Sequence, residues 1–181
     1  MMSGAAPKQH ITELAELSGI FNEKLREGGS VTFSPRGVSM LPMLRAYGDK
    51  VTLVKPPVLL KKGTVALFIL KNAEGGSKFV LHRLVKIKDD KLIFCGDRRL
   101  DCDPPVEYGD VVGVVSEYWS RGRQHTVREP LYRLYSFWMV HTVKVRGAAQ
   151  KLQDAVYRIW KRLGGGRSSK NNKNNKNNKT V

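Results

Sequence analysis

The sequence predicts a mainly β domain, a curled antiparallel sheet with a short helix before it and a long amphipathic helix after it. Three observations predict this fold class. Between residues 30 and 122, short runs rich in Val, Ile, Leu and Phe are separated by Gly, Pro and Asp pairs, and no helical period intervenes. Apolar residues recur at the helical period in 10–27, and they do so again in 131–163.

The first helix is expected over residues 10–27 and should end at Gly28–Gly29. Strands then follow at the runs of apolar and β-branched residues, which are 31–33, 50–54, 64–70, 79–88, 91–95 and 110–118. The pair Asp89–Asp90 between two of these runs predicts a tight hairpin. Because no helix separates the strands, we expect an antiparallel sheet rather than βαβ units.

After Pro130 an apolar stripe continues to Leu163, with basic residues off the stripe. Two interpretations of 131–163 stay open. The stripe docks on the β domain or on a partner helix, or the helix lies in a membrane interface as a peripheral contact. Residues 164–166 end the helix, and the Lys/Asn-rich segment 167–181 is expected to be disordered. The predicted regions are therefore 1–29, 30–122, 123–166 and 167–181.

The positive charge lies mainly in the C-terminal part of the chain. The formal net charge is +16, but residues 1–129 account for only +5, and residues 130–181 carry +11. Such a segment attracts lipid headgroups, nucleic acid or an acidic protein without choosing among them. No groove-reading or base-stacking motif accompanies it, so no specific nucleic acid is expected.

Neither a signal peptide nor a transmembrane anchor is expected. Residues 1–20 have no basic start and no long apolar run. The longest uncharged stretch after residue 130 is Leu134–Val143, which is half of the roughly 20 residues that cross a bilayer. We expect a cytoplasmic protein, with 131–163 as the candidate for peripheral contact with a membrane.

The segment from Pro35 to Val51 carries the features of a reactive site. It places Ser39 in a bend between two strands, flanked by Gly37 and Pro42. A serine hydroxyl needs a base within hydrogen-bond reach and backbone donors for the oxyanion. A turn directs the hydroxyl and nearby N–H groups at one point, but most serines in turns are structural, so the motif alone is weak.

Four segments in order resemble the boxes of the signal peptidase I and SOS-repressor (LexA-like) serine peptidase superfamily. Ser-Met-x-Pro-x-Leu from Ser39, followed by Gly48-Asp-Lys-Val, resembles the nucleophile box. Phe79–Val85, with His82 before an arginine, resembles the second box in the histidine form of the endoplasmic-reticulum and archaeal enzymes. Gly96–Asp103 and Gly109–Gly113 resemble the third and fourth boxes.

The resemblance implies a signal peptidase/LexA-like β fold and a serine endopeptidase. Ser39 would be the nucleophile and His82 its general base, and Asp97 and Asp103 are alternatives for the acid that orients the imidazole. An imidazole is largely neutral at pH 7 and can accept the serine proton. The residues that would shape the oxyanion site are Gly37, Met40 and Pro42. This chemistry implies neither a cofactor nor a metal.

The resemblance also implies the mode of substrate binding. An extended peptide or protein substrate would add a strand beside Val31–Phe33 and beside the strand that carries His82. Main-chain hydrogen bonds would supply affinity, and alternate side chains would enter pockets. Small residues such as alanine before the cut are what the family favours.

Two departures from the family pattern keep a rival open. Arg98-Arg99 replaces two asparagines beside the proposed acid, and Gly37 cannot supply a side-chain hydroxyl to the oxyanion. The rival is a catalytically inactive or regulatory protein-binding module on the same fold. It predicts that Ser39 and His82 are too far apart for a hydrogen bond, or that the acids point away from His82. A self-cleaving repressor is disfavoured because no DNA-reading module precedes residue 30.

Other polar residues in these boxes have structural interpretations. We expect Asp49 and Asp110 to hold turns, and Asp101 to be solvated. Arg83 is expected to pair with an acid or to pack its stem.

Overall fold

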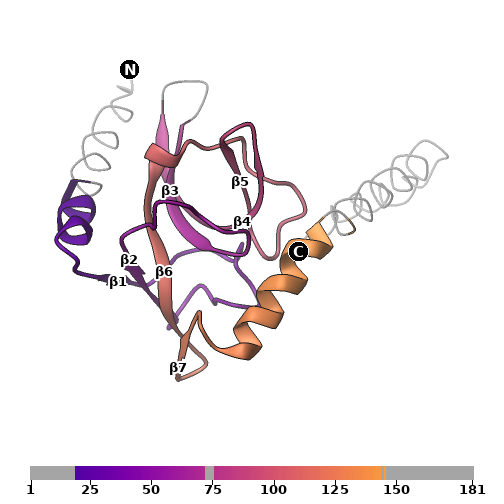
Figure 1. Ribbon diagram of the computed structural model, residues 1–181. Helices are drawn as coiled ribbons and strands as arrows, with labels where there is room; N and C mark the ends of the chain where they lie inside the picture. The colour runs from indigo at the N-terminus through magenta and orange to yellow at the C-terminus, as the bar shows by residue number, and fades with distance from the viewer. Residues whose placement is uncertain (1–18, 72–75, 144, 146–181) are drawn as a thin grey trace, which may run out of the picture. The chain divides into compact units, whose positions relative to one another are not determined.

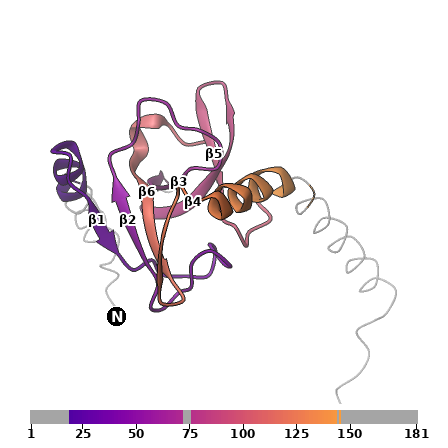
Figure 2. The same ribbon diagram turned by 60° about the horizontal axis from the view of Figure 1, so that its bottom comes forward.

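The computed structural model describes residues 19–71, 76–143 and 145 of the 181-residue chain. Seven strands form one antiparallel sheet in the order β1-β2-β6-β3-β4-β5, with β7 paired to β6 (Figures 1 and 2). Their bounds are β1 Val31–Phe33, β2 Lys50–Val54, β3 Val65–Lys71, β4 Ser77–Lys88, β5 Lys91–Cys95, β6 Val111–Ser120 and β7 Arg123–Thr126. The predicted mainly β, antiparallel class is confirmed.

The central strands are buried on both faces. Along β3, Val65 and Leu67 belong to one apolar cluster, and the alternate residues Ala66 and Phe68 belong to a second cluster. Side chains alternate between the two faces of a strand, so the two clusters lie on opposite faces of the sheet. This burial explains why β3 and the first half of β6 read as continuous apolar runs rather than as alternating ones.

Helical residues 19–26 show that the sheet curls. The Phe21 ring lies 6.3 Å from the ring of Phe33 on β1 and 6.2 Å from that of Phe79 on β4. In a flat sheet, strands four places apart would be separated by about 19 Å. One side chain can contact both only if the sheet bends to bring β1 towards β4. The part of the predicted helix before residue 19 lies outside the described residues.

The second helix covers residues 130–143 and packs through Tyr132 against the first apolar cluster. The remainder of the predicted helix 131–163 and the tail 167–181 lie outside the described residues. Within the described part of the chain, neither helix combines the length and the apolar character that a bilayer-spanning segment needs.

The structure adds a strand that the sequence analysis does not predict. β7 pairs with β6 through a hairpin at Arg121-Gly122, where both residues have positive φ. The predicted boundary after residue 122 therefore falls inside this hairpin. The chain divides into compact units Met1–Gly147 and Ala148–Val181, and all the described residues belong to the first unit.

The hairpin predicted between β4 and β5 offers a test of local stability. Asp89 and Asp90 have φ values of 50° and 55°, as a type I′ turn requires. Glycine adopts this region without steric cost, so Asp90→Gly should raise the free energy of unfolding by about 0.5 kcal/mol. Asp90→Ala should lower it by about 1 kcal/mol, and urea unfolding of the two variants checks the opposite signs.

Candidate functional site

Ser39 lies in the turn that connects β1 and β2. Gly37, with φ of +96°, reverses the chain just before it, and Leu41 N–H donates to Val38 O at 3.3 Å. The side chains that follow anchor the turn in the first apolar cluster; they are Met40, Met43 and Leu44. The Ser39 carbonyl also accepts from Arg98 N–H at 2.8 Å, which ties the turn to the loop after β5.

Asp49 closes the second half of the same loop. Its Oδ2 accepts from the Arg45 backbone N–H and from Ser120 Oγ, both at 2.8 Å. Burial by itself raises the pKa of the Asp49 carboxyl, but the hydrogen bonds from Arg45 and Ser120 outweigh burial and hold the pKa below its usual value. The carboxylate fixes the return of the chain into β2, as expected for a residue that holds a turn.

His82 is buried on β4 with a carboxylate on one ring nitrogen. His82 Nδ1 and Asp103 Oδ2 are 2.6 Å apart, and the two residues are 4% and 6% exposed. Asp103 N–H donates to Phe94 O at 2.8 Å, so β5 positions the loop that carries the acid. When the carboxylate of Asp103 is ionised it can only accept, and Nδ1 then carries the proton of this hydrogen bond. Nε2 is left as the acceptor, and it has no hydrogen-bond partner among the described residues.

Asp97, the alternative acid, pairs with Arg83 instead. Arg83 Nε and Nη2 donate to its two oxygens at 2.8 and 2.7 Å. Burial by itself lowers the pKa of the Arg83 guanidinium, but the hydrogen bonds and charge of Asp97 raise it above its usual value. Of the two acids that the sequence left open, the structure therefore places Asp103 on the imidazole and Asp97 on the adjacent arginine.

Ser39 and His82 line one cavity of about 240 Å³. The cavity also contacts Asp103 and Gly37, and it lies beside the part of β4 that precedes the β5 pairing. Ser39 Oγ forms no hydrogen bond to the His82 ring in the described structure. Hydrogen bonds between catalytic groups are often long without substrate and tighten in the complex, so this geometry is compatible with a reactive pair.

Two backbone donors stand beside the hydroxyl. The N–H groups of Ser39 and Met40 form no hydrogen bond within the described residues. Such groups can bind an oxyanion, because they are fixed dipoles that need no reorganisation. Gly37 and Met40 line the cavity, whereas Pro42, the third residue expected to shape the oxyanion site, is exposed after a cis peptide bond and does not line it.

Arg98 and Arg99 take different positions. Arg98 is exposed and contributes its backbone N–H to Ser39. Arg99 is paired with the exposed Asp101, and its Nη1 lies 3.5 Å from the second oxygen of Asp103. One cation therefore stands at the edge of the His82–Asp103 pair without displacing the carboxylate from the imidazole.

Side chains of the second helix hold Arg83 and Asp97, and these contacts were not predicted from the sequence. Arg83 Nη1 donates to Ser136 Oγ at 3.0 Å and to Tyr132 Oη at 3.2 Å. Tyr135 Oη donates to Asp97 at 2.8 Å. Their spacing of three and four residues places these hydroxyls on one face of a helix, which is the one signal that could have identified them.

Gly96 provides a test of how tightly the site is assembled. A Cβ there would come within 2.7 Å of Ser39 O and 3.0 Å of His82 Nε2. Gly96→Ala should therefore displace the turn that carries Ser39, lower the free energy of unfolding by about 1–3 kcal/mol and shift the NMR resonances of the imidazole. Gly109→Ala is the matched control, because nothing lies within 4 Å of its added Cβ. Unchanged imidazole resonances in the Gly96 variant would contradict this geometry.

No group of three or more His, Cys, Asp or Glu side chains is placed to hold a metal ion in the described ranges. Comparisons with protein-family models, with curated proteins and with solved structures found no match to this chain. Function is therefore inferred from the residues of the site and from the motif resemblance.

Proposed function

We propose that this chain is a serine endopeptidase on a signal peptidase/LexA-like β fold, with Ser39, His82 and Asp103 as its catalytic residues. One observation carries the proposal. A buried imidazole has its Nδ1 on a buried carboxylate, and its unpaired Nε2 belongs to a residue that lines the same cavity as Ser39. A nucleophile, a base and a third group that orients the base are the parts that acyl transfer requires.

The proposed reaction proceeds through an acyl-enzyme. Ser39 Oγ attacks a peptide carbonyl as its proton passes to His82 Nε2, and Asp103 stabilises the resulting imidazolium. The N–H groups of Ser39 and Met40 donate to the tetrahedral oxyanion. The C–N bond breaks as Nε2 returns the proton to the leaving amine. A water molecule then gives a proton to Nε2 as it attacks the ester carbonyl. The ester C–O bond breaks, Nε2 returns that proton to Ser39 Oγ, and the acid is released.

Two free strand edges suit an extended peptide substrate. β5 pairs with β4 only from Arg83 onward. Within the described residues, the first half of β4, Ser77–His82, therefore has β3 on one side and no strand on the other. Within the same described residues, β1 pairs only with β2. The cavity is lined from both sides, by Pro35–Gly37 after β1 and by Lys78–His82. A peptide strand added here would pass its carbonyls in front of Ser39.

A peptide-library experiment tests the proposal without knowledge of the natural substrate. The full chain is incubated with peptides derived from a whole proteome, and new termini are identified by mass spectrometry. We expect new termini that share a common residue pattern with the wild type, and none above background with Ser39→Ala. Ser34→Ala, a change at an exposed serine of the same loop, is the matched control and should cleave normally. Equal cleavage by wild type and Ser39→Ala would refute the proposal.

One observation favours the second candidate, an inactive or regulatory protein-binding module. Ser39 Oγ and the His82 ring form no hydrogen bond in the described structure, as this candidate requires. The acid bonded to His82 counts against it. The candidates differ in one result: a binding module captures extended peptides intact, and Ser39→Ala then leaves their affinity unchanged.

A further inference from the structure

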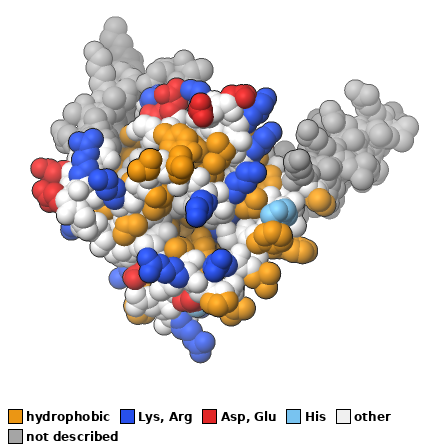
Figure 3. Space-filling view, in the orientation of Figure 1, with side chains coloured by type: hydrophobic (Ala, Val, Ile, Leu, Met, Phe, Trp, Pro, Cys, Tyr) orange, Lys and Arg blue, Asp and Glu red, His pale blue; other side chains and the backbone are white. Residues whose placement is uncertain are grey.

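The outer face of helix 130–143 exposes large apolar side chains. Leu131, Leu134 and Trp138 are 79%, 67% and 63% exposed, and their spacing places them on one side of the helix. Phe137 and Val145 are also exposed. Figure 3 shows hydrophobic side chains gathered over this helix, at the lower right of the view, with Lys and Arg side chains beside them. A contiguous apolar surface of this kind marks an interaction site.

The inner face of the same helix is firmly attached to the domain. Ser136 Oγ donates to Gly63 O at 3.0 Å and accepts from Arg83 at the same distance. Tyr132 is buried and its ring lies 5.8 Å from that of Tyr118. These contacts fix which face points away, so the exposed stripe is a stable surface feature within the described part of the chain.

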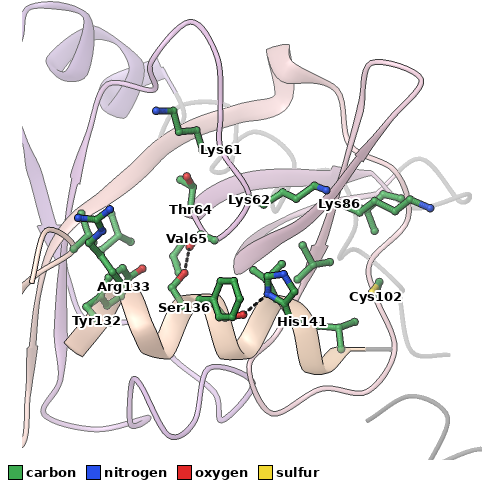
Figure 4. A pocket seen from close by; sticks show the side chains of 18 residues that line it. Lys61, Lys62, Thr64, Val65, Lys86, Cys102, Tyr132, Arg133, Ser136 and His141 are labelled. Carbon is green, nitrogen blue, oxygen red and sulfur yellow. Dashed lines mark hydrogen bonds between the residues drawn. The ribbon is translucent and has the colours of Figure 1, made fainter. Parts of the chain in front are cut away.

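A groove of about 810 Å³ lies between this helix and the sheet. Lys61, Lys62 and Lys86 come from the wall opposite the helix, and Arg133 comes from the helix itself (Figure 4). All four are exposed and form no ion pair within the described residues. Among the described residues that line the groove there is no Asp or Glu, and most of this exposed lining is apolar. A partner that fits this groove therefore carries both negative charge and an apolar part.

We propose that helix 130–143 and this groove form a docking surface for a bilayer that contains anionic phospholipid. The exposed stripe would enter the interfacial layer, where aromatic and aliphatic side chains are favoured together. The groove lysines would contact headgroup phosphates. Residues 144–181 add eleven Lys and Arg against one Asp, so the charge of the chain that follows has the same sign.

Two other classes of partner fit this surface less well. Nucleic acid would account for the lysines, but its affinity comes largely from phosphate contacts, and exposed Leu and Val side chains add nothing to those. A protein partner would account for the apolar stripe, but the cores of protein interfaces are depleted in lysine. A bilayer with anionic headgroups uses both features at once.

Vesicle sedimentation of the full chain tests the proposal. One set of vesicles is phosphatidylcholine alone, and the other is an equal mixture of phosphatidylcholine and phosphatidylglycerol. We expect binding to the mixed vesicles only. Lys61→Gln, Lys62→Gln and Lys86→Gln should each weaken it about fivefold, because one lysine near an anionic surface contributes about 1 kcal/mol. The matched controls are the same single change at Lys24, Lys50 and Lys55, which are exposed and lie outside the groove.

The apolar variant separates docking from simple charge attraction. The double variant Leu134→Ser, Trp138→Ser changes two exposed side chains, should fold normally and should weaken vesicle binding at least about tenfold. Ile20→Ser with Tyr47→Ser is the control, because both residues are exposed elsewhere. Wild-type binding by the Leu134/Trp138 variant, together with release of the protein by duplex DNA, would assign the charge to nucleic acid and overturn the proposal.

Fluorescence locates the docking element directly. In a chain that retains Trp138 as its single tryptophan (Trp119→Phe, Trp160→Phe), mixed vesicles should shift the emission to the blue, and brominated lipid should quench it. Unchanged emission on bound vesicles would overturn the role of the helix. Ser39→Ala should bind vesicles as the wild type does, so failure of the proposed peptidase activity and failure of docking give different results.

Discussion

Replacing His82 by alanine should lower kcat/KM for peptide cleavage by about 10⁴- to 10⁶-fold, to the level of Ser39→Ala. Without the imidazole, the hydroxyl loses the group proposed to take its proton. Combining the two changes should cost no more than either one alone, because nucleophile and base act as one unit. Initial rates on a peptide taken from the library cleavage pattern measure the effect. Additive losses in the double variant would show that the residues act independently and would contradict the assignment.

The acids provide the finer comparison. Asp103→Asn should lower kcat by about 10⁴-fold, because an amide in place of the carboxylate can hold the wrong imidazole tautomer. Asp101→Asn is the matched control, since Asp101 is exposed and bonds to Arg99 rather than to His82. Its rate should stay near that of the wild type. If Asp101→Asn lost most of its activity while Asp103→Asn remained fully active, the proposed roles of these two acids would have to be exchanged.

Stability measurements keep these effects separate from unfolding. Ser39→Ala removes a hydroxyl that has no hydrogen-bond partner in the described part of the chain, so the free energy of unfolding should change by less than about 0.5 kcal/mol. His82→Ala leaves the carboxylate of Asp103 buried without its main partner and should destabilise the fold more. Rates are therefore compared at a temperature where unfolding curves show every variant to be folded.

The features that could be predicted from the sequence are those that local pattern determines. Apolar runs between turn residues located β1 to β6 to within two residues at each end. The pair Asp89–Asp90 specified its own turn, since both positions need positive φ and aspartate tolerates it. β7 could not be predicted from the sequence, because Arg123–Thr126 has no alternation of apolar and polar residues. This segment is a strand because it pairs with β6.

The roles of the two acids could not be predicted, because they depend on how a loop returns to the sheet. Asp97 and Asp103 both follow β5 within eight residues, and either could reach β4 in an extended chain. The hydrogen bond from Asp103 N–H to Phe94 O and the pairing of Leu92 with Val106 fold the loop back. Neighbouring residues on β4 face opposite sides of the sheet, so one acid meets His82 and the other meets Arg83.

Replacing Asp97 by alanine should have the largest effect on stability, a loss of about 3–5 kcal/mol. Arg83 is fully buried, and Asp97 is its only anionic partner among the described residues. Removing the carboxylate leaves a cation in the core that still contacts the Gly63 carbonyl and Ser136 but has no countercharge. Urea unfolding measures the loss. Glu107→Ala removes an exposed partner of Lys91 and should change stability little, since that pair lies in water.

A second variant distinguishes an uncompensated charge from lost packing. In Arg83→Met with Asp97→Leu both charges are removed together, so stability should be higher than in Asp97→Ala although two side chains differ from wild type. If Asp97→Ala is instead the more stable of the two, groups other than Asp97 must stabilise the charge of the Arg83 guanidinium. Variants of Asp97 and Asp103 should also rank in opposite order when their activity and their stability are compared. Asp103→Asn should lose activity with a smaller loss of stability, and folded Asp97→Ala should retain most of its activity, because His82 keeps its own carboxylate.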